Sequence, residues 1–190
     1  MDDLFAFLVE MDKLKSVYRR SYLSDLSRNE NSAEHSWHLA VAILTIKDEF
    51  SLDIDIGRAV KMALIHDICE IGAGDISIYD PERSKKEKKE RKYLQALSEM
   101  PVSFSSDIEC LWEEYEAQTT PESHWVKIVD RLLPFMLNVS TAGKAWIEQG
   151  ITQSQVKEVN QTMAAEAPEI YQWLLVQIEK AVEKGWLLDE

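Results

Sequence analysis

At residues 58–67 the chain reads RAVKMALIHD, an apolar helical run that ends in a histidine and an aspartate. This pair is out of place on a helix face that packs against a core, because a buried carboxylate is costly unless it is paired or binds a metal. His66 and Asp67 offer one imidazole nitrogen and one carboxylate oxygen to the same cation. The dipeptide alone is weak evidence, since a histidine near a helix C-terminus also interacts favourably with the helix dipole.

Three other places in the sequence strengthen the metal interpretation. His35 lies at the start of another predicted helix, and Asp130 interrupts the apolar helical stretch IVDRL at residues 128–132. The third place is EIGAGD at residues 70–75, where two carboxylates flank a pair of glycines. Imidazole and carboxylate donors together suit a divalent ion that keeps open positions for water and substrate. The candidate metal ligands are therefore His35, His66, Asp67 and Asp130.

Periodicity and capping signals predict an all-α protein, a helical bundle with the metal site between its helices. Capping boxes are expected at Asn31 with Glu34, at Ser106 with Glu109 and at Thr152 with Gln155. Residues 19–31 show no regular period, and no strand pattern is longer than four residues. We expect helices over residues 2–15, from 31 or 32 to 50, from 53 or 55 to 72, and over 81–99, 107–117, 121–139, 152–166 and 168–185.

Composition limits the function classes. The 190 residues predict a single domain over 1–190, with a metal core at about 31–140 and C-terminal helices at 152–186 packing on it. The net charge of −13 argues against a nucleic-acid polymer or an anionic membrane as partner. Two isolated cysteines, together with the lack of a secretory signal or a membrane-spanning stretch, predict a cytoplasmic protein.

Four segments resemble one known family. They are RNENSAEHSWHL at residues 28–39, HDICEIGAGD at 66–75, LWEEYEA at 111–117 and the pattern of Trp146 followed by Gly150-Ile151. Together they resemble the HD-domain superfamily of metal-dependent phosphohydrolases, in particular a bacterial subgroup similar to the HD-domain 5′-deoxynucleotidases. The matches span about residues 14–151. The resemblance implies a hydrolase that releases phosphate from a small phosphomonoester, with a nucleoside 5′-monophosphate as first choice, and a homodimer.

The resemblance also implies roles for individual residues. Glu70 and Asp75 match positions that bear on water activation and leaving-group protonation in the deoxynucleotidases. Arg20 matches a phosphate-binding arginine placed ahead of the first ligand histidine. The next position, an aromatic residue in those enzymes, is Ser21 here, which puts discrimination between deoxyribose and ribose in doubt. The metal is one divalent ion, whether Co, Mn, Zn, Ni, Fe or Mg.

A basic run between residues 83 and 92 offers a second source of phosphate-binding cations. Its usual meaning is a solvated helix face with ion pairs four residues apart. In so acidic a protein, however, a basic helix directly after the Gly-Asp loop favours an anion near the metal. Lys85 and Lys88 are therefore the second choice for contacting the substrate phosphate.

Two other functions stay open at this point. Some HD proteins bind two irons and oxidise their substrates, but these need more histidines between His66 and Asp130 than the single His124 found here. The other possibility is a module that binds the metal without turnover. Glu70 and Asp75 argue against it, because both carboxylates serve acid–base chemistry.

Overall fold

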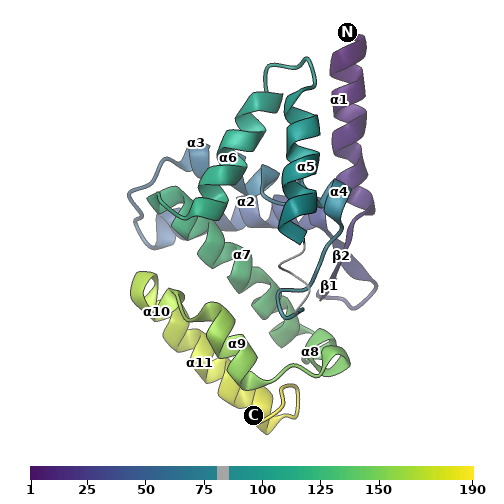
Figure 1. Ribbon diagram of the computed structural model, residues 1–190. Coiled ribbons are helices and arrows are strands. Elements are labelled where there is room, and N and C mark those ends of the chain that lie inside the picture. Colours follow the sequence, from purple (N-terminus) through teal and green to yellow (C-terminus); the bar gives the residue numbers. More distant parts are fainter. Residues whose placement is uncertain (81–85) are drawn as a thin grey trace. The chain divides into compact units, whose positions relative to one another are not determined.

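The computed structural model describes residues 1–80 and 86–190 (Figure 1). In these residues helices dominate, and the predicted all-α class is confirmed. None of the described helices is long and apolar enough to cross a membrane. The chain divides into two compact units, residues 1–19 with 31–129 and residues 20–30 with 130–190. The prediction of one domain over 1–190 stays a prediction.

The first unit contains most of the elements that carry predicted site residues. α5 packs against α4 and α6, and α2 packs against α3 (Figure 1). The bounds are α1 Asp2–Asp12, a 3-10 helix Lys13–Ser16, α2 Ser32–Glu49, α3 Ile56–Ile65, α4 Glu70–Ala73, α5 Lys86–Ser98 and α6 Ser105–Ala117. A core joins α1 to α6 and includes the side chains of Phe7, Leu14, Ile65, Ile68, Leu94, Leu97, Ile108, Leu111 and Trp112.

The second unit packs around aromatic side chains. Phe135 lies with its ring centroid 5.3 Å from that of Trp146 and 5.9 Å from that of Trp173. Its elements are α8 Lys144–Gln149, α9 Gln153–Asn160, α10 Met163–Glu166 and α11 Pro168–Glu183. Three elements run across the boundary between the units, namely β1 Tyr18–Tyr22, β2 Asn29–Asn31 and α7 Pro121–Ser140.

Several predicted helix ends match the structure. The capping boxes of Asn31 with Glu34 and of Thr152 with Gln155 are both present. The carboxylate of Asp55 caps α3 by accepting a hydrogen bond from the backbone of Arg58. These caps form because the side chains satisfy N–H groups that have no partner inside the helix.

Other predicted boundaries were wrong. The helix predicted to end at Gly72 ends at Ile65, where the chain tightens into turns before α4 begins at Glu70. Ser106 is not a cap, because α6 begins one residue earlier and has no side-chain cap. The helix predicted over 152–166 is interrupted between α9 and α10, α8 was not predicted, and the start predicted at Pro81 lies outside the described residues.

The prediction for residues 19–31 was also wrong, because β1 and β2 form a small two-stranded sheet there. β1 is five residues long, and its inward positions are occupied by Arg19 and Ser21, which are less exposed than Tyr18 and Arg20. A search for alternating apolar residues misses such a strand, since its buried side chains are polar.

Candidate metal centre

His35 is fixed by the first turn of α2. Asn31 accepts a hydrogen bond from the Glu34 backbone, and the Glu34 side chain accepts one from the Asn31 backbone in return. This reciprocal cap sets where the helix begins, and therefore which face His35 occupies. The His35 side chain is completely buried, and its ring centroid lies 5.4 Å from that of His66.

His66 ends α3, and its ring nitrogens have different surroundings. Nδ1 lies 2.9 Å from the carbonyl oxygen of Ala63, which can only accept a hydrogen bond, so Nδ1 carries a hydrogen. In the neutral ring Nε2 then holds a lone pair, yet it lies 3.2 Å from a carboxylate oxygen of Asp67. Two acceptors at this distance repel each other unless a positive charge accompanies them. A bound metal ion or a proton on Nε2 supplies that charge.

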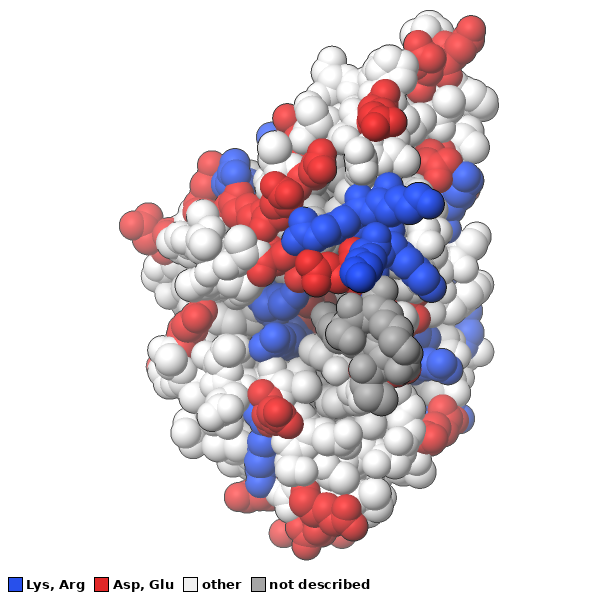
Figure 2. All heavy atoms as spheres, in the orientation of Figure 1, with Lys and Arg blue, Asp and Glu red and all other residues white. Residues whose placement is uncertain are grey.

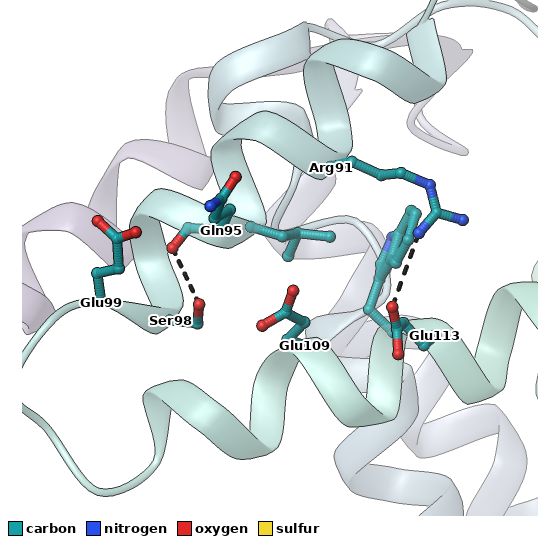
Figure 3. Close-up of a pocket in the computed structure, with 8 residues that line it drawn as sticks. Arg91, Gln95, Ser98, Glu99, Glu109 and Glu113 are labelled. Carbon is teal, nitrogen blue, oxygen red and sulfur yellow. Dashed lines mark hydrogen bonds and ion pairs between the residues drawn. The ribbon is translucent and has the colours of Figure 1, made fainter.

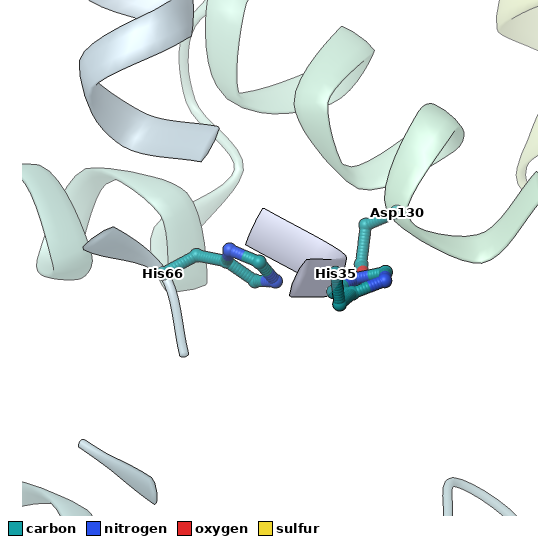
Figure 4. A group of neighbouring side chains, drawn as sticks. All are labelled: His35, His66 and Asp130. Atoms are coloured by element: carbon teal, nitrogen blue, oxygen red, sulfur yellow. The ribbon is translucent and has the colours of Figure 1, made fainter. Parts of the chain in front are cut away.

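Asp130 belongs to the same group of donors. It follows directly on Val129 along α7, which continues through Pro134 to Ser140. One possible ligand atom from each of His35, His66 and Asp130 lies within 4.8 Å of the others (Figure 4). Two imidazoles and one carboxylate fit a borderline divalent ion such as zinc, cobalt, manganese or iron, so the residues present are suitable for the predicted metal.

Asp67 is the predicted ligand that lies outside this close group. One of its oxygens faces His66, and the other accepts a hydrogen bond of 2.6 Å from Nη1 of Arg19. Burial raises the pKa of the Asp67 carboxyl, but the nearby charges of His66 and Arg19 outweigh burial and lower that pKa overall. Asp67 is therefore ionised, as a metal ligand must be.

Glu70 is buried at the start of α4, with an exposed fraction of 3%. The hydroxyl of Ser32 donates to Oε2 at 2.7 Å, and the ammonium of Lys86 donates to Oε1 at 2.6 Å. Burial and the negative charge of Asp67 raise the pKa of Glu70 to about 7, although Lys86 and Arg19 oppose the shift. A carboxyl group that titrates near neutral pH suits acid–base chemistry.

Asp75 follows α4 in a loop that begins at Gly74, whose φ of 77° favours glycine. Burial raises the pKa of Asp75, and the charge of Asp67 adds to this effect while Arg19 and Lys86 oppose it. Glu70 and Asp75 both therefore retain a proton to higher pH than ordinary carboxyls do.

Comparison with known proteins places the chain in a family. A model of the HD domain matches residues 11–171. The chain belongs to the HD domain family. The resemblance inferred from the sequence motifs is thereby confirmed.

Relatives in the HD domain family include proteins named 5′-deoxynucleotidase HDDC2. The human protein is 34% identical over 131 residues, and the zebrafish protein is 31% identical over 137 residues. These alignments cover 67% and 70% of this chain but only 63% and 66% of the two relatives. The chain thus spans less than two thirds of the length of these relatives.

A solved structure agrees with the HD assignment along nearly the whole chain. It is described as a predicted metal-dependent phosphohydrolase from Magnetospirillum magnetotacticum MS-1. It is 36% identical and has a TM-score of 0.90, with 98% of this chain and 94% of the other covered. An HD-domain phosphohydrolase from Listeria innocua, with a TM-score of 0.65 and 17% identity, shares the fold.

The predicted substrate-binding residues lie in different settings of this HD domain. Arg20 is exposed on β1, where its carbonyl oxygen accepts a hydrogen bond from the Asn29 side chain. Lys88 is exposed on α5, and Lys85 lies outside the described residues. Figure 2 shows the basic side chains of α5 gathered on one face, beside acidic ones.

Sequence reasoning missed two cations that the structure places at the site. Arg19 contacts Asp67, and Lys86 contacts Glu70. No sequence pattern marked Arg19, because the strand that places it on the same face as the buried Ser21 lacks alternating apolar residues. Within the basic run, Lys86 is the lysine with a glutamate four residues later, Glu90, but this spacing is typical of ion pairs on an exposed helix face and does not indicate burial.

A separate hollow lies between α5 and α6 and contains none of the predicted site residues (Figure 3). Its volume is about 440 Å³, and three glutamates, Glu99, Glu109 and Glu113, line it with Arg91 and Trp112. Arg91 lies 3.7 Å from Glu113 and over the ring of Trp112. Such acidic walls repel a phosphate group, so this hollow does not suit the predicted substrate.

Proposed function

We propose that this HD domain is a metal-dependent phosphohydrolase that releases phosphate from a small phosphomonoester. A nucleoside 5′-monophosphate is the first choice, and the names of the HDDC2 relatives support it. The observation that carries the proposal is the close donor group of His35, His66 and Asp130 in the same chain as the buried acid Glu70. Asp67 completes the proposed ligand set.

The residues of the site divide the proton transfers between them. When bound, a divalent ion supplies Lewis acidity to the phosphoryl oxygens and lowers the pKa of a water molecule. Glu70 accepts a proton from the attacking water as its oxygen bonds to phosphorus. Asp75, whose pKa is raised by burial, donates a proton to the alkoxide oxygen as the ester bond breaks. The products are an alcohol and inorganic phosphate.

The phosphate group needs a cation, because the site already holds several carboxylates. Arg20 stays our first candidate for this contact, since a guanidinium holds two phosphate oxygens at once. Lys85 and Lys88 stay second. Loss of hydrolysis in Lys85→Ala together with full activity in Arg20→Ala would reverse this order.

The test of the function is a panel of phosphomonoesters, nucleotides included, assayed for phosphate release after reconstitution with each candidate metal. We expect hydrolysis of at least one nucleoside 5′-monophosphate. Bound metal without release from any ester would instead favour the binding module. The oxygenase alternative finds no support at His124, whose Nε2 lies 2.6 Å from the carbonyl oxygen of Gln118.

Metal binding has its own test. Changing His66 or Asp130 to alanine removes a ligand, so we expect sharply reduced metal content by elemental analysis. His38→Ala is the matched control, because His38 lies one turn beyond His35 but outside the close donor group. Full metal content in both His66→Ala and Asp130→Ala would refute the assignment.

We also propose that the protein is cytoplasmic and forms a homodimer. The dimer is supported by apolar side chains left exposed on the first two helices, including Phe5, Leu8 and Trp37. Light scattering at micromolar concentration should give twice the chain mass. A monomer would contradict this proposal without affecting the metal site.

A further inference from the structure

Lys86 has surroundings that set it apart from the other lysines of the basic run. Its exposed fraction is 8%, whereas Lys88 and Lys89 on the same helix are exposed. Lysine is almost never buried unless it is paired. Here the ammonium lies 2.6 Å from Oε1 of Glu70 and 3.2 Å from Oε1 of Glu90. Lys86 therefore points inward, toward the proposed acid–base residue.

The contacts of Glu70 complete a bridge between two helices. Ser32, in the first turn of α2, donates to one carboxylate oxygen, and Lys86, at the start of the described part of α5, donates to the other. Each oxygen of Glu70 is thus held by a donor from a different element. Such two-sided contact fixes the orientation of the carboxylate, which a proton acceptor requires.

Stability does not account for this ion pair. Moving each charge of a buried ion pair out of water costs on the order of several kcal/mol. Proteins in which well-packed apolar residues replace such a pair are often equally or more stable. Burial alone lowers the pKa of Lys86, but the charge of Glu70 outweighs it and raises that pKa, so the ammonium stays charged. A charged lysine held against a buried carboxylate in this way points to a role in the chemistry.

We propose that Lys86 is a positioning residue that, together with Ser32, holds Glu70 in the orientation and charge state needed to accept a proton. This inference rests on the proposed function. Lys86 acts through Glu70 and does not bind the substrate phosphate, because its ammonium is already shared between Glu70 and Glu90. The exposed cations stay available for the phosphate.

A double-mutant cycle distinguishes a Lys86 that positions Glu70 from a Lys86 that binds the substrate phosphate. Lys86→Met keeps much of the apolar stem, removes the charge and is combined with Glu70→Gln in one chain. Lys89→Met is the matched control, since it removes an exposed charge from the same helix at a residue with no proposed part in phosphate binding. The readouts are kcat and KM for phosphate release from a deoxynucleoside 5′-monophosphate, with metal content and circular dichroism confirming that each variant is folded and loaded.

We expect Lys86→Met to lower kcat by about 10- to 100-fold, as loss of a supporting contact usually does, with KM unchanged. In the Glu70→Gln background the same change should cause no further loss. A raised KM, with losses that multiply in the double variant, would show that Lys86 binds substrate. Wild-type kcat in Lys86→Met would overturn the proposal as well.

A second readout does not depend on turnover. In urea unfolding of the metal-free protein, the effects of Lys86→Met and Glu70→Gln should be non-additive, whereas those of Lys89→Met and Glu70→Gln should add. Additive effects for Lys86 and Glu70 would show that the contact is absent in solution. If the wild type releases no phosphate with any metal, the proposed function fails, and the unfolding cycle still decides whether Lys86 holds Glu70.

Discussion

At the scale of single residues, the sequence identifies the candidate metal ligands better than it identifies the cations that contact the carboxylates of the site. His35, His66 and Asp130 were recognisable because each places a polar group in an apolar helical context, and the structure brings the three together. Arg19 and Lys86 were not chosen, because each stands among similar basic residues. Which of them faces inward depends on tertiary contacts that no local pattern specifies.

Glu70→Gln should separate chemistry from metal binding. The amide keeps the shape of the side chain but cannot accept a proton, so turnover should fall by roughly 10²–10⁴, the usual scale for a positioned acid or base. Metal content should stay at the wild-type level. Near-normal phosphate release would mean that Glu70 only shapes the start of α4.

The raised pKa of Glu70 predicts how the metal-free protein responds to pH. Its pKa is 4.5 ordinarily and about 7 in the fold, so the folded state binds more protons than the unfolded state between these values. The free energy of unfolding should therefore fall as pH rises through this window. The raised pKa of Asp75 acts in the same direction above its own ordinary value.

Urea unfolding at several pH values between about 5 and 8 measures this dependence. Glu70→Gln has no proton to lose in this range, so its curve should be flatter than that of the wild type. Parallel curves for the two proteins would show that Glu70 does not titrate as its burial implies.

At the scale of elements, helix starts were easier to predict than helix interruptions. The caps at Asn31, Asp55 and Thr152 are local, since each side chain accepts a hydrogen bond from the backbone N–H three residues away. The break after Ile65 has no such local signal. Gly72 was read as the end of a helix, but it lies inside α4 and is needed there for packing.

Gly72 lets α5 approach α4 closely. A Cβ atom built at Gly72 would lie 2.5 Å from Cδ2 of Tyr93, and Tyr93 is itself held by a hydrogen bond of 2.9 Å to Glu10. Gly72→Ala should therefore destabilise the protein by about 1–3 kcal/mol through overpacking. It should also lower turnover, because α5 carries Lys86.

The matched control for this change is Gly57→Ala in α3. There the added methyl group would meet only a side-chain oxygen of Asp55, at 3.3 Å. Thermal unfolding of both variants, with phosphate release as the second measurement, compares them directly. Equal stability of the two variants would show that the space between Gly72 and Tyr93 relaxes freely.

At the scale of the whole molecule, the helical class followed from composition and periodicity, but the division into two units did not. The chain leaves the first unit after Arg19, returns at Asn31 and leaves again after Val129. The last crossing falls inside α7, without a proline- or glycine-rich linker. A boundary between compact units that falls inside a continuous helix is not accompanied by a change in amino-acid composition. The sequence therefore predicted a single domain.

The shortness of α4 has a consequence for how the proposed hydrolase activity would be lost. Its four residues are far below the ~12–15 at which an isolated helix becomes even marginally stable in water, so α4 depends on its contacts with α5. Local opening of α5 releases α4 and Glu70, while His35 and His66 stay on the longer helices α2 and α3. At low denaturant concentration, phosphate release should therefore be lost while the metal is still bound. Inactivation should precede global unfolding.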